Sequence, residues 1–183
     1  RFFMPVSQLA GQKVLEEYPV DGRKLRIIHP GIDLDRFDGP DRRRRREEVR
    51  RRFSIEPDTL TVLFVSMNFE IKGLDAVIAA LGHLKRKSRP SRTVLLAVGK
   101  GNRRKYAAQA EACGIAGDVI FAGVERDNLE SFYLASDLFI MLSRFDTFGI
   151  TVLEAMAASL PVIVSSTVGA KDLVNEGING YIV

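Results

Sequence analysis

Residues 61 to 66 read Thr-Val-Leu-Phe-Val-Ser, and residues 93 to 98 read Thr-Val-Leu-Leu-Ala-Val. Both runs are short, apolar on both faces and rich in β-branched residues, which is typical of strands that helices cover on two sides. Between them, Gly73–Lys87 carries apolar residues at the three-and-four spacing of one buried helical stripe. A strand, a helix and a strand in this order predict a right-handed parallel crossover.

The same alternation continues toward the end of the chain. Further strands are predicted at Val119–Phe121, Leu138–Leu142 and Pro161–Ser165, and the final residues Gly180–Val183 resemble the beginning of another strand. Further helices are predicted at Arg103–Cys113, Asn128–Ala135 and Gly149–Ala158. Gly114 suits a left-handed C-cap, and Asp127 with Glu130 suits a capping box before the Asn128–Ala135 helix. We therefore expect an α/β fold with a Rossmann-like, doubly wound parallel sheet.

The first sixty residues are less regular. A helix entered through Ser7 is predicted at Val6–Tyr18, a short strand at Leu25–Ile28 and a surface helix at Arg42–Phe53. The chain opens on Arg-Phe-Phe-Met and closes on a half-formed strand, so we expect a fragment of a longer protein.

The composition excludes several classes of protein. With 183 residues, 46% of them hydrophobic and 27% charged, the chain is neither disordered nor long enough for two large domains. A single cysteine, Cys113, excludes a disulfide framework and favours a reducing compartment. Eight arginines and three acids between residues 41 and 52 account for the net charge of +4. This run predicts a solvated helix face; contact with anionic lipid or nucleic acid is the alternative, although aromatic residues for base stacking are missing from it.

Ligands of an open parallel sheet bind at the carboxyl ends of the strands, so the loops found there are the candidate sites. The first such loop ends in Lys72-Gly73, where a cation at a helix start costs about 0.3–1 kcal/mol. A bound anion would reverse that sign, whereas a solvated lysine would merely tolerate the position. The second loop carries Gly99-Lys100-Gly101, and Glu125 ends the next strand; together they resemble part of a dinucleotide fingerprint. Arg104 replaces its third glycine, so this signal for a dehydrogenase is weak.

The third loop, from Ser143 to Glu154, carries two carboxylates eight positions apart, Asp146 and Glu154. Gly149 marks the expected helix start, so the amides of Gly149, Ile150 and Thr151 are candidate anion donors. Glu154 stands among apolar or small residues and needs a partner, which a sugar hydroxyl could supply. The alternative is an ordinary helix-start acid and a surface glutamate. His29 and His83 have no partner at ligand spacing, so no metal site is expected.

Taken together, these segments resemble one family. Ile27–Phe37 is similar to the segment that leads into the C-terminal domain of family-four retaining glycosyltransferases of the GT-B fold. Lys72-Gly73 resembles their phosphate-binding pair and Phe121-Ala122-Gly123 their turn beside the base, while residues 146–162 resemble their two-carboxylate signature and the helix and strand that follow. The resemblance is closest to the lipopolysaccharide core glucosyltransferase I group, to which Met67–Gly73 and the Lys100 segment are similar.

The resemblance implies a role for each candidate residue. Lys72 would neutralise the donor diphosphate, Asp146 would bind the transferred sugar and Glu154 the ribose hydroxyls. The amides of Gly149, Ile150 and Thr151 would hold the distal phosphate, with Lys100 on the phosphate side, and Val124 to Arg126 would line the base. Two departures stand out. Asp146 replaces the usual glutamate, and Met67 replaces an arginine common in the family.

For the whole protein the resemblance implies a cytoplasmic bacterial hexosyltransferase, either free or at the inner face of the membrane, that moves glucose from UDP-glucose without a metal. Residues 1–24 would be a remnant of the N-terminal domain, and residues 25–183 the nucleotide-sugar-binding domain. The acceptor, a lipid-linked saccharide or polysaccharide, would bind the missing N-terminal domain, so this fragment alone would be inactive. The alternatives are a nucleotide- or NAD-binding module of a dehydrogenase and, less favoured, a glycosidase built on the two carboxylates.

Overall fold

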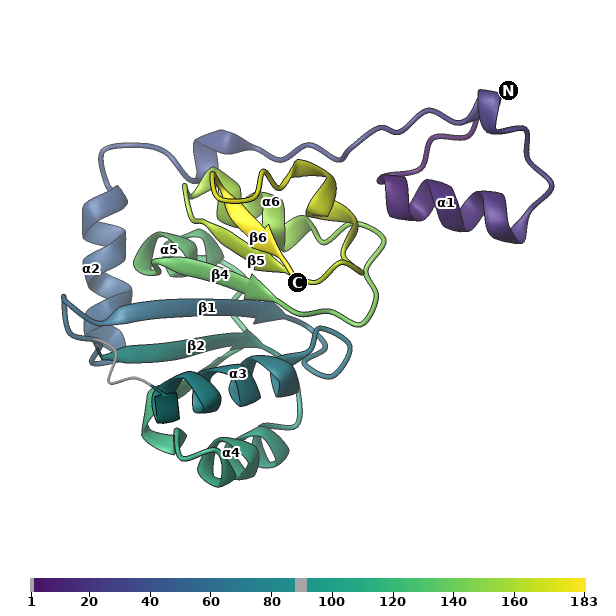
Figure 1. The fold of residues 1–183 in the computed structure, drawn as a ribbon. Coiled ribbons are helices and arrows are strands. Elements are labelled where there is room, and N and C mark those ends of the chain that lie inside the picture. The colour runs from purple at the N-terminus through teal and green to yellow at the C-terminus, as the bar shows by residue number, and fades with distance from the viewer. Residues whose placement is uncertain (1, 88–91) are drawn as a thin grey trace.

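The computed structural model describes residues 2–87 and 92–183, and these form one parallel sheet with helices on both faces (Figure 1). The six strands lie in the order β3-β2-β1-β4-β5-β6. Their bounds are Leu60–Ser66 (β1), Thr93–Gly99 (β2), Val119–Gly123 (β3), Leu138–Met141 (β4), Val162–Val164 (β5) and Gly180–Ile182 (β6). The doubly wound order and the strand begun at Gly180 confirm the sequence-based prediction of the fold.

The helices divide between the two faces of the sheet. Their bounds are Gln8–Glu17 (α1), Arg42–Arg52 (α2), Leu74–Lys87 (α3), Arg103–Ala112 (α4), Leu129–Ala135 (α5) and Ile150–Ala157 (α6). Short 3-10 turns occupy Gly22–Lys24 (η1), Leu34–Arg36 (η2), Ala116–Asp118 (η3) and Gly169–Leu173 (η4). The helices α2, α5 and α6 share one apolar core, and α3 and α4 share the other (Figure 1).

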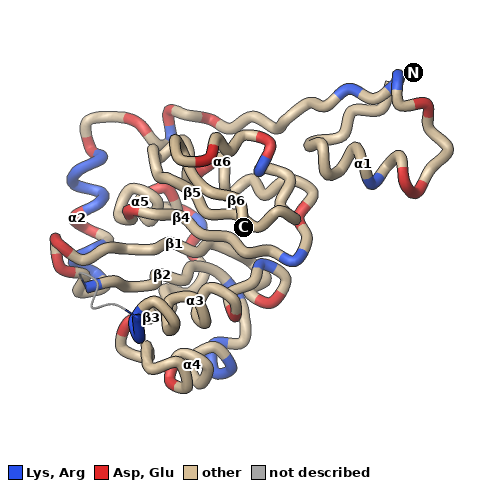
Figure 2. Tube along the Cα trace, viewed as in Figure 1, with Lys and Arg blue, Asp and Glu red and all other residues tan. Residues whose placement is uncertain are grey.

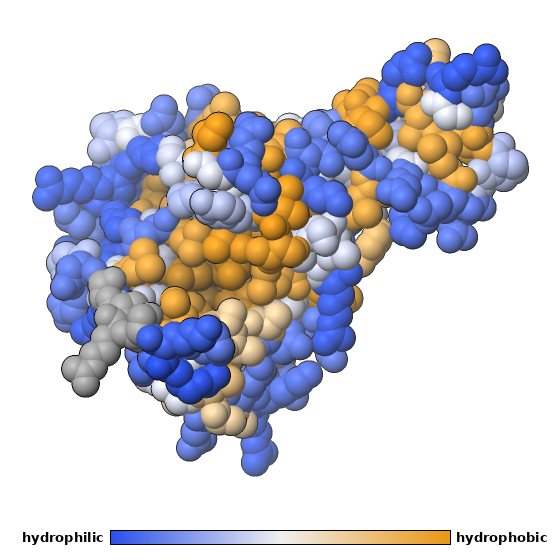
Figure 3. Space-filling model, viewed as in Figure 1, coloured by the Kyte–Doolittle hydropathy of each residue, from blue (hydrophilic) through white to orange (hydrophobic). Residues whose placement is uncertain are grey.

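The central strand β1 contributes to both cores because successive side chains of a strand point to opposite faces. Leu63 and Val65 pack in the core with α5 and α6, while Val62 and Phe64 pack in the core with α3 and α4. On the face of Figure 3, apolar side chains gather near β4 to β6, beside the strand that ends the chain. The double-sided apolar pattern of residues 61–66 is therefore explained by burial on both faces.

The N-terminal segment lies apart from the sheet (Figure 1). Its helix begins as predicted at Ser7, whose side chain accepts a hydrogen bond from the amide of Ala10. The predicted strand Leu25–Ile28 is wrong: Leu25 forms only an isolated bridge with Phe3, and Ile28 is 54% exposed. The amides of Arg26 and Ile28 do donate to the carbonyls of Phe3 and Pro5, but the pairing does not extend beyond this bridge, because Pro5 has no amide to donate in return.

Of two local predictions about helix ends, one is confirmed and one is wrong. Gly114 does adopt the left-handed conformation expected of a C-cap, with φ of 74°. The capping box at Asp127 is wrong, because Asn128 is the N-cap of α5 and makes no side-chain cap bond. Glu130 is instead buried and forms ion pairs with Arg36 and Arg45. The two cations offset the cost of burying that carboxylate, so Glu130 is not available as a helix cap.

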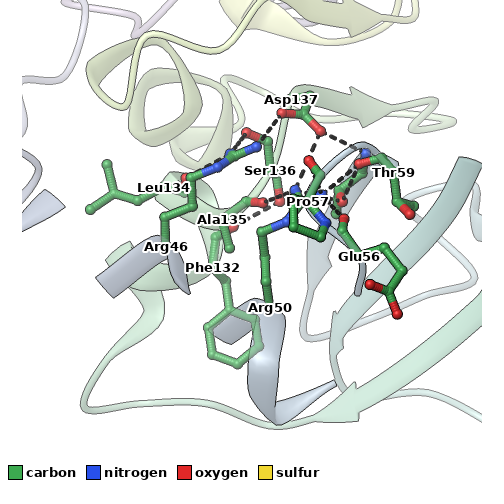
Figure 4. A network of polar contacts seen from close by, with 11 residues as sticks. Arg46, Arg50, Glu56, Pro57, Thr59, Phe132, Leu134, Ala135, Ser136 and Asp137 are labelled. Carbon is green, nitrogen blue, oxygen red and sulfur yellow. Dashed lines mark hydrogen bonds and ion pairs between the residues drawn. The ribbon is translucent and has the colours of Figure 1, made fainter. Parts of the chain in front are cut away.

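Figure 2 shows the arginine run as the blue part of α2, and this run is only in part the solvated face that its composition predicts. Arg43 and Arg44 are exposed and pair with Glu47 and Glu48 on the same helix. Arg46 turns inward, where it donates to the carbonyls of Leu134 and Ser136 and pairs with Asp137 at 2.7 Å (Figure 4). Much of this positive charge therefore serves to fasten α2 to the end of α5.

Arg50 lies at the centre of the same network (Figure 4). Its Nη1 donates to the carbonyl of Ala135 at 2.9 Å, and its Nη2 donates to the carbonyls of Glu56 and Thr59 at 2.6 and 2.7 Å. The carboxylate of Asp137 lies 3.6 Å away. The side chain is only 6% exposed, and this burial lowers the pKa of the guanidinium from its usual value.

Candidate functional site

A pocket of about 640 Å³ lies at the carboxyl ends of β1, β2 and β3. Its wall is formed by Met67 after β1, Lys100 after β2, and residues 124–127 after β3. Three of the predicted site residues, Lys100, Val124 and Arg126, therefore come together at the edge of the sheet where such folds bind ligands.

The glycines of the second loop serve packing within the chain. A Cβ at Gly99 would overlap the carbonyl oxygen of Ser66, and a Cβ at Gly101 would overlap the ring of Phe69. Glu125, the acid expected near a ribose in the dehydrogenase interpretation, pairs with Arg52 at 3.2 Å. The partial dinucleotide fingerprint thus reflects close packing of this loop on the one after β1.

Lys72 and Asp146 meet in an ion pair, although they lie on different loops. Lys72 does not open the helix as predicted, because α3 begins two residues later at Leu74. Asp146 is held in turn by the amide of Phe148, which donates to its Oδ1 at 3.1 Å. Asp146 is thus the anion that neutralises Lys72 in this structure, and both side chains remain partly exposed.

The two loops are also joined through their backbones. The carbonyl of Ile71 accepts from the amide of Arg144 at 2.9 Å and from the hydroxyl of Ser143 at 3.1 Å. Gly73 packs so closely on Leu142 that a Cβ there would overlap the Leu142 carbonyl. The position of Lys72 relative to Asp146 is therefore set by main-chain contacts.

The beginning of α6 lies beside this pair. Gly149 is the N-cap, in the left-handed conformation with φ of 90°, and an added Cβ would lie 2.6 Å from the side chain of Met141 and 3.4 Å from Oδ2 of Asp146. Within the described chain, the amides of Gly149, Ile150 and Thr151 donate no hydrogen bond. These donors and the ammonium of Lys72 together provide an arrangement suited to an anion.

Glu154, in the second turn of α6, is half-buried, between the buried residue and the surface glutamate that the sequence allowed. Its partner in this structure is Tyr133 on α5, whose hydroxyl donates to Oε2 at 2.7 Å. Burial raises the pKa of the Glu154 carboxyl above its ordinary value of 4.5, and the hydrogen bond from Tyr133 and the charge of Arg36 oppose that rise. Among the described residues, Glu154 forms no hydrogen bond or ion pair with Lys72 or Asp146.

Comparison with known proteins places this geometry in a family. The family model of glycosyl transferases group 1 matches residues 45–183. The chain belongs to this family. It is 30% identical over 174 residues to a D-inositol 3-phosphate glycosyltransferase of Xylanimonas cellulosilytica, in a match that covers 91% of this chain and 40% of the relative.

Solved structures show the same fold as this group 1 chain. WaaG, a glycosyltransferase involved in lipopolysaccharide biosynthesis, matches with a TM-score of 0.82 at 27% identity over 98% of this chain and 48% of its own. Anabaena HepE in complex with UDP-glucose matches with a TM-score of 0.81 at 22% identity over 100% of this chain and 49% of its own, which shows the fold alone. The chain spans less than half the length of each of these proteins.

Family membership weighs against the dehydrogenase and glycosidase alternatives, since the group 1 family is one of glycosyl transferases. No helix within residues 2–87 or 92–183 is both long enough and apolar enough to span a membrane. In the same residues, no three His, Cys, Asp or Glu side chains gather where they could hold a metal ion.

Sequence reasoning missed Tyr133 as the hydrogen-bond partner of Glu154. It stands 21 positions before Glu154, on a helix predicted only for its apolar residues. The signal that could have revealed it is the phenol itself, in a segment buried without interruption from Glu130 to Ser136. A buried tyrosine hydroxyl usually has a hydrogen-bond partner, so it indicates a polar group nearby.

Proposed function

We propose that this chain is the donor-binding half of a retaining hexosyltransferase that takes UDP-glucose as donor. The observation that carries the proposal is the junction of Lys72, Asp146 and the unpaired amides at the start of α6. A nucleoside diphosphate has the charge and the oxygen acceptors that such donors bind. The relation to HepE in complex with UDP-glucose supports the choice of donor through the fold.

In this proposal the donor lies along the carboxyl edge of the sheet. The base occupies the pocket lined by Val124 and Arg126, with Lys100 on the phosphate side. The diphosphate takes the place of the Asp146 carboxylate beside Lys72, and the amides of residues 149–151 hold its distal phosphate. Asp146, freed from Lys72, contacts the transferred sugar, and Glu154 contacts the ribose hydroxyls.

The chemistry follows from where charge develops. When the bond between the sugar and the diphosphate breaks, negative charge grows on the leaving phosphate. Lys72 and the helix amides are oriented toward that charge before the reaction, so they stabilise the transition state without a metal ion. The sugar acceptor, which we expect to be lipid-linked or a polysaccharide as in lipopolysaccharide assembly, requires the other half of the protein. The chain alone binds donor and transfers nothing, and the whole protein acts in the cytoplasm.

Calorimetric titration of the 183-residue chain with UDP, ADP and NAD tests the proposal. We expect UDP to bind most tightly and Lys72→Ala to weaken it by about tenfold or more, since a charged hydrogen bond contributes about 1.5–3 kcal/mol. Glu154→Ala should weaken UDP to a similar degree. Lys85→Ala is the matched control. Lys85 lies at the far end of α3 and forms a comparable surface ion pair with Asp118 of η3.

Two results would contradict the proposal. Preference for NAD over UDP would instead favour the nucleotide-binding module of a dehydrogenase. Equal loss of UDP affinity in Lys72→Ala and Lys85→Ala would show that overall positive charge, rather than this junction, attracts the ligand.

A further inference from the structure

Tyr133, the hydrogen-bond partner of Glu154, is fully buried among aromatic rings. Tyr133 is 0% exposed, and its ring lies between Phe37 and Phe139, with ring centroids 5.9 and 6.0 Å away. Rings packed on two sides leave the side chain one conformation, so its hydroxyl has a fixed direction. That direction is toward Oε2 of Glu154, at 2.7 Å.

The second carboxylate oxygen of Glu154 is differently placed. Oε1 has no hydrogen-bond partner among the described residues. Among these residues the buried side-chain atoms without a partner are Nε of Arg50 and Oγ1 of Thr59, so Oε1 of Glu154 reaches solvent. Oε2 is thus fixed by the hydrogen bond from Tyr133, while Oε1 faces solvent and is free to accept a hydrogen bond.

We infer that Tyr133 is a positioning residue of the ribose subsite, whose phenol holds Oε2 of Glu154 so that Oε1 accepts the nucleotide's ribose hydroxyls. The inference rests on the function proposed above. Tyr133 touches neither donor nor reacting atoms and acts only through Glu154. A carboxylate without this bond would rotate about its last side-chain bonds and lose part of its preference for a diol.

The charges around Glu154 fit this role. Glu130, on α5 beside Tyr133, pairs with Arg36 of η2 and Arg45 of α2 and is thereby neutralised. Burial and Glu130 raise the pKa of Glu154, while the Tyr133 hydroxyl and Arg36 lower it. Removal of the hydroxyl should therefore raise the pKa of Glu154 further and leave less of the anion that accepts from ribose.

The test compares UDP with 2′-deoxyUDP on wild type and on Tyr133→Phe of the 183-residue chain. We expect wild type to prefer UDP by about tenfold, the worth of one hydrogen bond to a charged group. Tyr133→Phe should reduce this preference to about threefold or less, and the fall of UDP affinity at acid pH should begin at a higher pH.

Tyr106→Phe is the matched control, because Tyr106 is also buried, at 2% exposure, and its hydroxyl forms no hydrogen bond within the described chain. It should keep the wild-type preference for UDP. A Tyr133→Phe protein that retains both the preference and the pH profile would overturn the inference alone. A wild-type chain that binds no UDP would overturn the proposed function as well.

A measurement on wild type covers the case in which Tyr133→Phe does not fold. The carbon resonance of the Tyr133 ring next to the hydroxyl should report the titration of Glu154. Bound UDP should lower the pH of that titration, because ribose hydroxyls donate to the same carboxylate and favour its charged form. A titration that UDP leaves in place would contradict the inference.

Discussion

Gly73 joins the two loops that carry Lys72 and Asp146. It has φ of 76°, in the left-handed region, and a Cβ there would overlap the carbonyl of Leu142. Gly114 has almost the same backbone angle, φ of 74°, but nothing lies within 4 Å of its Cβ position. The two glycines therefore separate the cost of the backbone conformation from the cost of the contact.

Gly73→Ala should lower the free energy of unfolding by about 3 kcal/mol or more, whereas Gly114→Ala should lower it by about 1–2 kcal/mol, the penalty for a left-handed residue alone. Urea unfolding followed by circular dichroism measures both values. Equal losses in the two variants would contradict the claim that Gly73 is required by its contact with Leu142.

Single residues of the candidate site were predictable where they lie near the N-terminal end of a helix, because free amides and an unfavourable cation there both favour a bound anion. The amide donors at Gly149 and the lysine near a helix start follow from the helix dipole. The ion pair of Lys72 with Asp146 was not predictable, because the two residues are separated by 74 positions and meet only through neighbouring strands. The sequence suggested a ligand hydroxyl as the hydrogen-bond partner of Glu154, whereas in the structure this partner is the hydroxyl of Tyr133.

At the scale of elements, α2 shows how composition alone can mislead. Its sequence is eight arginines among eleven residues with Val49 as the apolar member, which suggests a wholly solvated helix. Arg46 and Arg50 nevertheless point to the carbonyls that end α5 and to Asp137. The last carbonyls of a helix lack partners of their own, and cations satisfy them well.

Arg50→Met should lower the free energy of unfolding by about 3 kcal/mol, because buried carbonyls of Ala135 and Thr59 lose their donors. Arg44→Met is the control, because Arg44 is exposed and the loss of its surface pairs with Asp41 and Glu48 should change the free energy of unfolding far less. Chemical denaturation compares them. A loss in Arg50→Met no larger than in Arg44→Met would contradict the anchoring role.

The strands and helices from residue 60 onward were predictable because their apolar patterns are set by burial in one core or in two. Strand β1 is apolar on both faces, and α3 has the stripe expected of one covered side. The segment Leu25–Ile28 has strand-like composition, but its neighbour, residues 3–5, contains Pro5, which cannot donate to a strand ladder. The composition of the segment itself does not reveal which residues it will pair with.

The whole molecule consists of a packed domain and a lightly attached N-terminal segment. In the described chain, both core clusters draw their buried residues from Phe37 onward. The segment is tied to the domain near η4 by Ser7, which donates to the carbonyl of Thr147, and by the amide of Gln8, which donates to Asp172.

Deletion of residues 1–24 should leave a folded domain that unfolds cooperatively. The loss should be about 1–3 kcal/mol, the size of a few hydrogen bonds, with a nearly unchanged dependence on urea because little apolar surface is removed. Loss of cooperative unfolding would contradict the domain boundary predicted at residue 25.

The carbonyl of Ile71 accepts hydrogen bonds from both Ser143 and Arg144, so it joins the loop that carries Lys72 to the loop that carries Asp146. In the function proposed above, a donor whose phosphates replace Asp146 beside Lys72 would also move Asp146, the residue proposed to contact the sugar. Affinity for the nucleotide and preference for the sugar would then be coupled. A substitution in either loop should therefore change both properties.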